Sequence, residues 1–133
     1  MGNRAAIRTT ASKCGIYLHW NGGVESVLAF LEAAKQLDVR DPAYDDAYCL
    51  ARLTQIIGNF FGGTTSLGIF GDVRLSDYAD NGIYVIGEDF KIVERINAPD
   101  SITEVDQLDE DGRKYYDSVL AEALGKNQLI FGE

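Results

Sequence analysis

The chain has 133 residues, of which 46% are hydrophobic and 25% are charged, and its formal net charge is −9. This length and composition predict one folded domain over residues 1–133 and exclude a disordered chain, because apolar residues are numerous enough to build a core. The negative charge argues against direct binding to nucleic acid or to an anionic membrane, since both require a basic surface. It fits solubility, or the docking of a basic protein partner.

The first residues contain no apolar run of signal-peptide length, and no later segment approaches the length of a membrane span. Cys14 and Cys49 are 35 positions apart, and each lies in apolar sequence. We therefore expect two reduced, buried thiols in a protein of the host-cell cytoplasm.

Residues 4–10 and 14–20 are short runs of β type, and the second places Ile16, Leu18 and Trp20 on one face. They predict a β-hairpin that ends at two glycines. A helix is expected from Val24 to about residue 38, because the apolar residues then follow helical spacing.

A second helix is predicted to begin at Asp41-Pro42, an N-cap followed by a first-turn proline, and to stop at Gly62-Gly63. Residues 64–71 have room for one short strand.

Residues 72–82 form a predicted polar loop, and 83–86 and 90–96 a second hairpin around a turn at 87–89. A last helix is expected to end at Gly125. The order β-β-α-α-(β)-β-β-α predicts an α+β fold, in which an antiparallel sheet of four to five strands carries helices packed on one face.

His19 is the only histidine, and the sequence places no orienting carboxylate beside it. A zinc site would need two or three further ligands, so we expect no metal, cofactor or catalytic residue. Cys14 would lie on the opposite strand face from His19, whereas pairing of Cys49 with His19 stays open. The turn from His19 to Gly23 joins a strand to a helix and could hold a small anion, although it lacks the lysine and spacing of a phosphate loop.

The segment from Asp100 to Asp111 contains six carboxylates and no basic residue. Such a run can be a solvated face that stabilises the start of a helix. It can also imitate phosphates and dock onto lysines and arginines. On the second interpretation the partner-binding residues are Asp100, Glu104, Asp106, Asp109, Glu110 and Asp111, with Asp117, Glu88 and Asp89 as extensions.

Four sequence stretches carry a resemblance: GNRAAI at 2–7, IYLHWNGG at 16–23, ARL and IIGNFFGG within 51–63, and DNGIY at 80–84. Together they resemble a family of small proteins carried by phages and other mobile elements, for which no activity is established. The resemblance covers roughly the first hundred residues. Small acidic proteins of that setting include inhibitors of bacterial defence, above all anti-CRISPR proteins.

The leading hypothesis is therefore a non-enzymatic anti-CRISPR inhibitor. Its acidic face would bind the basic surface of a host CRISPR effector or of another nucleic-acid-binding protein. Two alternatives remain: a small-molecule-binding or hydrolytic protein that uses the His19–Gly23 turn, and a mobile-element accessory protein that acts through an oligomer interface.

Overall fold

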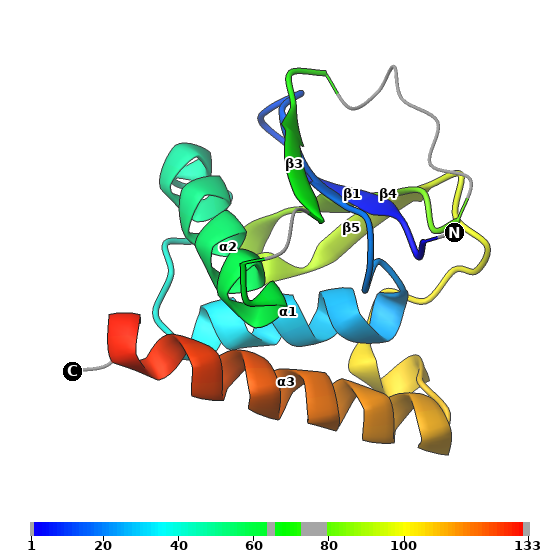
Figure 1. Ribbon diagram of the computed structural model, residues 1–133. Helices are drawn as coiled ribbons and strands as arrows, with labels where there is room; N and C mark the ends of the chain where they lie inside the picture. Colours follow the sequence, from blue (N-terminus) through cyan, green and yellow to red (C-terminus); the bar gives the residue numbers. More distant parts are fainter. Residues whose placement is uncertain (1, 64–65, 73–79, 132–133) are drawn as a thin grey trace.

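A computed structural model describes residues 2–63, 66–72 and 80–131, and these residues form one five-stranded sheet and three α-helices (Figure 1). The element order confirms the predicted one, including the short strand after the second helix. The elements are β1 (Ala5–Thr9), β2 (Gly15–Leu18), α1 (Val24–Gln36), α2 (Asp46–Phe61), β3 (Leu67–Phe70), β4 (Ile83–Ile86), the 3-10 turn η2 (Glu88–Phe90), β5 (Ile92–Ile96), the 3-10 turn η3 (Val105–Gln107) and α3 (Glu110–Phe131).

The strand order across the sheet is β3-β2-β1-β4-β5, and the sheet is mixed. The neighbours β1/β2, β2/β3 and β4/β5 are antiparallel, as predicted, but β1 and β4 are parallel. The difference arises between β3 and β4: β3 is antiparallel to β2 and so runs in the direction of β1, and β4 runs in that direction too. Hydrophobic alternation identifies a strand but does not give its direction.

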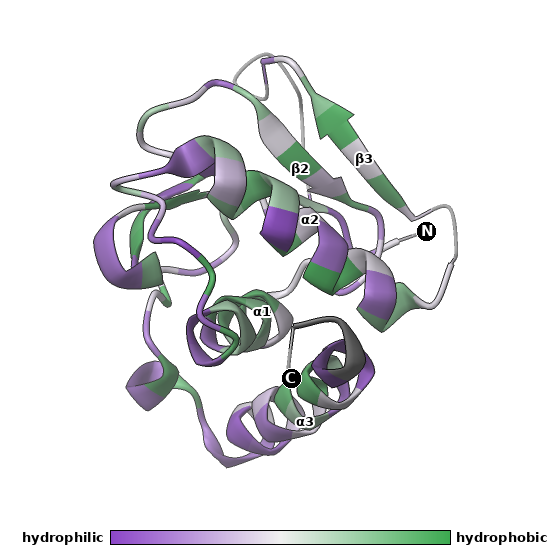
Figure 2. Ribbon diagram, turned by 90° about the vertical axis from the view of Figure 1, so that its left-hand side faces the viewer, coloured by the Kyte–Doolittle hydropathy of each residue, from purple (hydrophilic) through white to green (hydrophobic). Residues whose placement is uncertain are grey.

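Helix α1 lies between the sheet and α3, so the molecule has three layers (Figure 1). Figure 2 shows α1 end-on, with strands above it and α3 below it. Val24, Val27, Leu28, Leu31 and Ala34 are buried at helical spacing, and Ser26, Phe30 and Ala33 on other sides of the helix are buried too. A helix covered on two sides must be apolar nearly all round.

The second helix begins four residues later than predicted. Asp45 is its N-cap and accepts a hydrogen bond from the backbone N–H of Tyr48 (3.2 Å). Asp41 instead closes a turn, because its carboxylate accepts the N–H of Ala43 (2.9 Å). Gly62 ends the helix with φ 73°, as the paired glycines predicted.

Replacing Asp45 by alanine should lower stability at neutral pH, because the cap of α2 is lost. The guanidinium of Arg40 holds the pKa of the Asp45 carboxyl below its usual range, with the hydrogen bond to Tyr48 adding to the effect. A lowered native pKa gives stability above the unfolded-state pKa that is lost as pH falls through the native one. Urea unfolding should therefore give a lower free energy of unfolding for Asp45→Ala than for the wild type near pH 7. This difference in free energy should narrow as the pH falls toward about 2. Glu94→Ala, on an exposed strand position, is the control; a gap independent of pH would contradict the argument.

Helix α3 continues through Gly125 to Phe131, so the predicted end at Gly125 is wrong. Ala123 and Asn127, on either side of this glycine, are both fully buried. Contacts on both sides outweigh the poor helix propensity of glycine. In the part of the chain that the structure describes, neither this helix nor another is long and apolar enough to cross a membrane.

Candidate functional site

The acidic segment connects β5 to α3 and is anchored by three inward-facing apolar residues. Ile102, Val105 and Leu108 follow one another at intervals of three and pack against the main core. Glu104 and Asp106, between these apolar residues, are consequently turned outward. All six carboxylates of the segment from Asp100 to Asp111 are exposed. The backbone of this segment is thus held in place by the core.

Asp100 forms an ion pair within the molecule. Its Oδ1 lies 2.9 Å from Nη1 of Arg95, whose side chain is only 5% exposed. The same oxygen accepts the N–H of Ile102 (3.0 Å), and the Arg95 guanidinium lies 4.3 Å from the centre of the Tyr84 ring. Asp100 neutralises a buried cation, which makes it a structural residue.

Asp109 and Glu104 have local structural roles as well. Asp109 caps α3, since its Oδ1 accepts the N–H of Gly112 (2.7 Å). Glu104 begins η3 in a capping box, in which Gln107 Oε1 accepts the Glu104 N–H (3.0 Å). These contacts explain part of the acidic run without any partner.

Glu104, whose side chain is exposed, forms a group with the three other carboxylates near the start of α3, and we call this group the acidic ridge: Glu104, Asp106, Glu110 and Asp111. Among the described residues, no lysine or arginine forms an ion pair with any of them. Arg113, the next basic residue along the chain, pairs with Asp117 (3.6 Å). The ridge therefore presents uncompensated negative charge.

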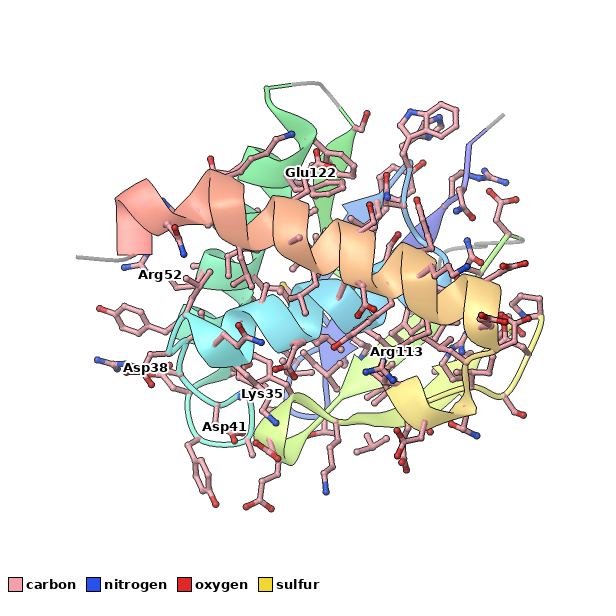
Figure 3. The ribbon with its side chains drawn as sticks, turned by 90° about the horizontal axis from the view of Figure 1, so that it is seen from below. Lys35, Asp38, Asp41, Arg52, Arg113 and Glu122 are labelled. Carbon is pink, nitrogen blue, oxygen red and sulfur yellow. The ribbon has the colours of Figure 1, made fainter. Side chains whose placement is uncertain are left out.

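The proposed extensions of the ridge are each engaged elsewhere. Glu88 accepts the hydroxyl of Tyr44 (3.0 Å), and Asp89 pairs with Lys35 (3.4 Å). Asp89 and Glu104 line one shallow hollow of about 180 Å³, but Lys35 and Lys91 line it too. Figure 3 shows Lys35 at the end of α1 and Arg113 beside η3 on this side of the molecule. Cations therefore lie between Asp89 and the ridge, so these extensions do not continue the ridge without interruption.

A second hollow, of about 410 Å³, is lined by Gly2, Arg4, His19 and Asp80. His19 Nδ1 lies 2.7 Å from the hydroxyl of Tyr17. Arg4 Nε lies 2.9 Å from an oxygen of Asp80, and this contact lowers the pKa of the Asp80 carboxyl. The hollow can accept a small polar group.

The backbone of His19 has a structural role. Its carbonyl accepts the N–H of Asn3 (2.8 Å), and its N–H donates to Ser66 (2.9 Å). Trp20, expected on the buried face, is 46% exposed because β2 ends at Leu18.

No cysteine is among the described residues that line the hollow at His19. Cys49 is buried in the core on α2, and burial raises the pKa of its thiol to about 12. Cys49 does not line the hollow at His19 among the described residues, so the structure does not bring the two together as a catalytic pair. Among the described residues, no group of three or more potential ligands is close enough to hold a metal ion.

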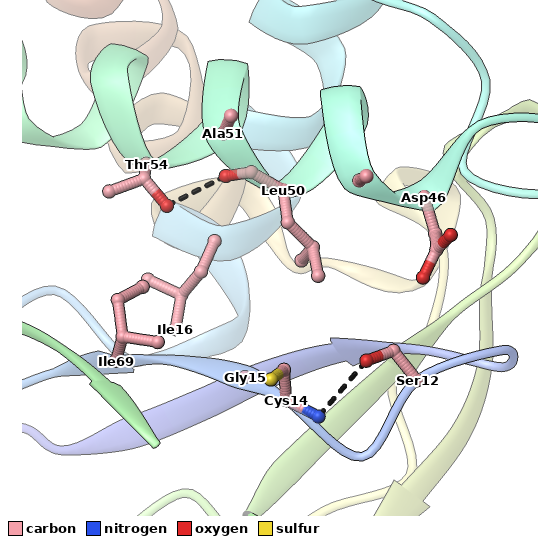
Figure 4. Close-up of a pocket in the computed structure, with 10 residues that line it drawn as sticks. Ser12, Cys14, Gly15, Ile16, Asp46, Leu50, Ala51, Thr54 and Ile69 are labelled. Atoms are coloured by element: carbon pink, nitrogen blue, oxygen red, sulfur yellow. Dashed lines mark hydrogen bonds between the residues drawn. The ribbon is translucent and has the colours of Figure 1, made fainter. Parts of the chain in front are cut away.

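An apolar groove of about 320 Å³ runs between α2 and the β2–β3 edge of the sheet. Figure 4 shows Leu50 above and Ile16 and Ile69 below, with Cys14 at the other end of the groove. Cys14 is exposed, contrary to expectation, because it lies in the hairpin turn just before β2 begins. Sequence patterns gave no sign of this groove, since it depends on which strand lies at the edge.

No protein-family model matches the chain, and no curated protein or solved structure was found to be similar to it. These comparisons therefore assign no function to the site.

Proposed function

We propose that the chain is a non-enzymatic inhibitor that docks through the acidic ridge onto a basic, nucleic-acid-handling surface of a host defence complex. A CRISPR effector is the specific candidate. The observation that carries the proposal is the ridge: exposed carboxylates without a described cationic partner, on a segment whose apolar residues are fixed to the core.

Carboxylates held at fixed positions can replace the phosphates of a nucleic acid on a surface of lysines and arginines. Because Ile102, Val105 and Leu108 already hold the backbone, docking orders little additional chain. The net charge of −9 would also accelerate the encounter with a basic partner. The resemblance to mobile-element proteins supports a defence complex as the source of that partner.

Reversing two ridge charges should weaken docking at least tenfold, as a rough estimate for the loss of several charge pairs. The variant is Asp106→Lys with Glu110→Lys, and the readout is displacement of labelled DNA from purified CRISPR effector complexes over a series of salt concentrations. Wild-type displacement should weaken steeply as salt rises, because screening reduces charge pairing.

The matched control is Glu94→Lys with Glu122→Lys, which changes the net charge equally at exposed positions outside the ridge. We expect the control to displace DNA nearly as well as wild type. Equal loss in both variants would indicate a general charge effect, and absence of displacement by the wild type would reject the effector as the target.

A further inference from the structure

The two edges of the sheet differ in how they are protected from further pairing. β5 carries the charged residues Glu94 and Arg95, and its pairing with β4 is irregular at Val85/Ile86. β3 lies at the other edge, and residues 66–71 contain no charge and no proline. Charges and bulges are the usual means of blocking an edge strand, and β3 has neither.

The register with β2 determines which backbone groups of β3 face outward. His19 N–H donates to the carbonyl of Ser66, so the Ser66 backbone points toward β2. The direction of the backbone N–H and C=O groups alternates along a strand. Those of Gly68 therefore also point toward β2, whereas those of Leu67 and Ile69 point away from it. Within the described residues, no strand pairs with that outer side.

The side chains of these two residues lie on the helix side of the sheet. Leu67 is half-buried and packs against the core. Ile69 lines the apolar groove beside α2 and is 63% exposed, the most exposed large aliphatic side chain among the described residues. An open backbone edge and an exposed apolar side chain thus occur at the same place.

We propose that β3 pairs antiparallel with β3 of a second copy of this chain, around a two-fold axis at Gly68. In this register the outward N–H and C=O groups of Leu67 bond those of the partner's Ile69, and the symmetric pair forms on the other side of the axis. The two Gly68 residues face each other as a pair without hydrogen bonds, the position at which strands approach most closely. The two sheets become one, and each Ile69 is covered by a leucine of the other copy.

The strand itself fits a second copy as the occupant, because residues 66–71 contain no charge that would oppose the same segment of another chain. Each chain carries −9, so two copies repel each other over most of their surfaces. The uncharged segment 66–71 allows two copies to meet without opposing carboxylates in the pairing strands. The arrangement of Leu67, Gly68 and Ile69 is self-complementary, as a two-fold interface requires.

Sedimentation velocity under reducing conditions tests the proposal directly. The average mass of the wild type should rise with concentration from 14.6 kDa toward twice that value. Ile69→Lys should weaken dimerisation about tenfold or more, because it places a charged side chain opposite Leu67 of the other copy, once on each side of the axis. The matched control is Val93→Lys, since Val93 is 56% exposed on the opposite edge and should leave dimerisation unchanged.

Amide hydrogen exchange of the wild type gives a second readout that needs no variant. Protection of the Leu67 and Ile69 amides should increase with protein concentration, whereas that of Gly68, already directed to β2, should not. Salt should leave the dimer intact or strengthen it, the opposite of its effect on ridge docking, so the two proposals can fail separately. A mass of 14.6 kDa at every concentration, or equal weakening by Val93→Lys, would overturn the dimer.

Discussion

Replacing Asp100 by lysine is expected to destabilise the protein by about 2–3 kcal/mol. The Arg95 side chain is 5% exposed, and the carboxylate of Asp100 is its only ion-pair partner among the described residues. Two of its nitrogens, Nε and Nη2, find no hydrogen-bond partner within the described part of the chain, so the guanidinium depends strongly on the bonds that Nη1 makes. A lysine at position 100 would leave a buried cation unpaired beside a second cation.

Urea unfolding followed by circular dichroism measures this loss, with Asp106→Lys as the control. That substitution makes the same charge change at an exposed position that has no ion-pair partner among the described residues, and it should shift stability by less than about 0.5 kcal/mol. Equal destabilisation by both substitutions would indicate that net charge, and not the Arg95–Asp100 pair, controls stability.

The different roles of Asp100, which pairs with buried Arg95, and Asp106, which is exposed, determine how the proposed function can be tested. Reversing the whole acidic segment would remove the Arg95 partner and the α3 cap together with the ridge. Loss of inhibition by such a variant would follow from unfolding as readily as from lost docking. Substitutions restricted to Asp106 and Glu110 separate the two effects.

The sequence predicted the element order because hydrophobic periods of two and 3.6 residues distinguish strands from helices. It did not predict the parallel pairing of β1 with β4, because β3 and β4 follow each other in the chain but lie on opposite sides of the β1/β2 pair. The start of α2 was misplaced because Asp41-Pro42 and Asp45 both carry an N-cap signal. Asp41 instead accepts the N–H of Asp89 (2.8 Å), a long-range contact that no local pattern predicts.

The acidic run was visible in the sequence, but which of its carboxylates have structural roles was only partly predictable. Asp109, followed by Glu110 and Asp111, has the pattern of an N-cap before an acidic first turn, so its role could have been inferred. The role of Asp100 could not, because nothing in the sequence shows that Arg95 is buried over Tyr84. The open edge at β3 likewise depends on strand order.

The second large effect concerns a buried amide that joins α2 to α3. Asn127 is fully buried; its Oδ1 accepts from Asn59 Nδ2 (2.8 Å), and its Nδ2 donates to the carbonyls of Ala123 (2.7 Å) and Ile56 (3.2 Å). Asn127→Ala should cost about 2 kcal/mol, because it leaves the Asn59 donor without this acceptor and opens a small cavity. The free energy of urea unfolding provides the measurement.

A double-mutant cycle with Asn59→Ala isolates the contact between the helices, and we expect a coupling of about 1 kcal/mol. Gln128→Ala, at the adjacent exposed position, should change stability by less than about 0.5 kcal/mol. Additive effects of Asn59 and Asn127 would show that the amide contact does not join the helices. The ridge is held separately through Ile102, Val105 and Leu108, so a folded Asn127→Ala variant should retain the docking affinity of the wild type.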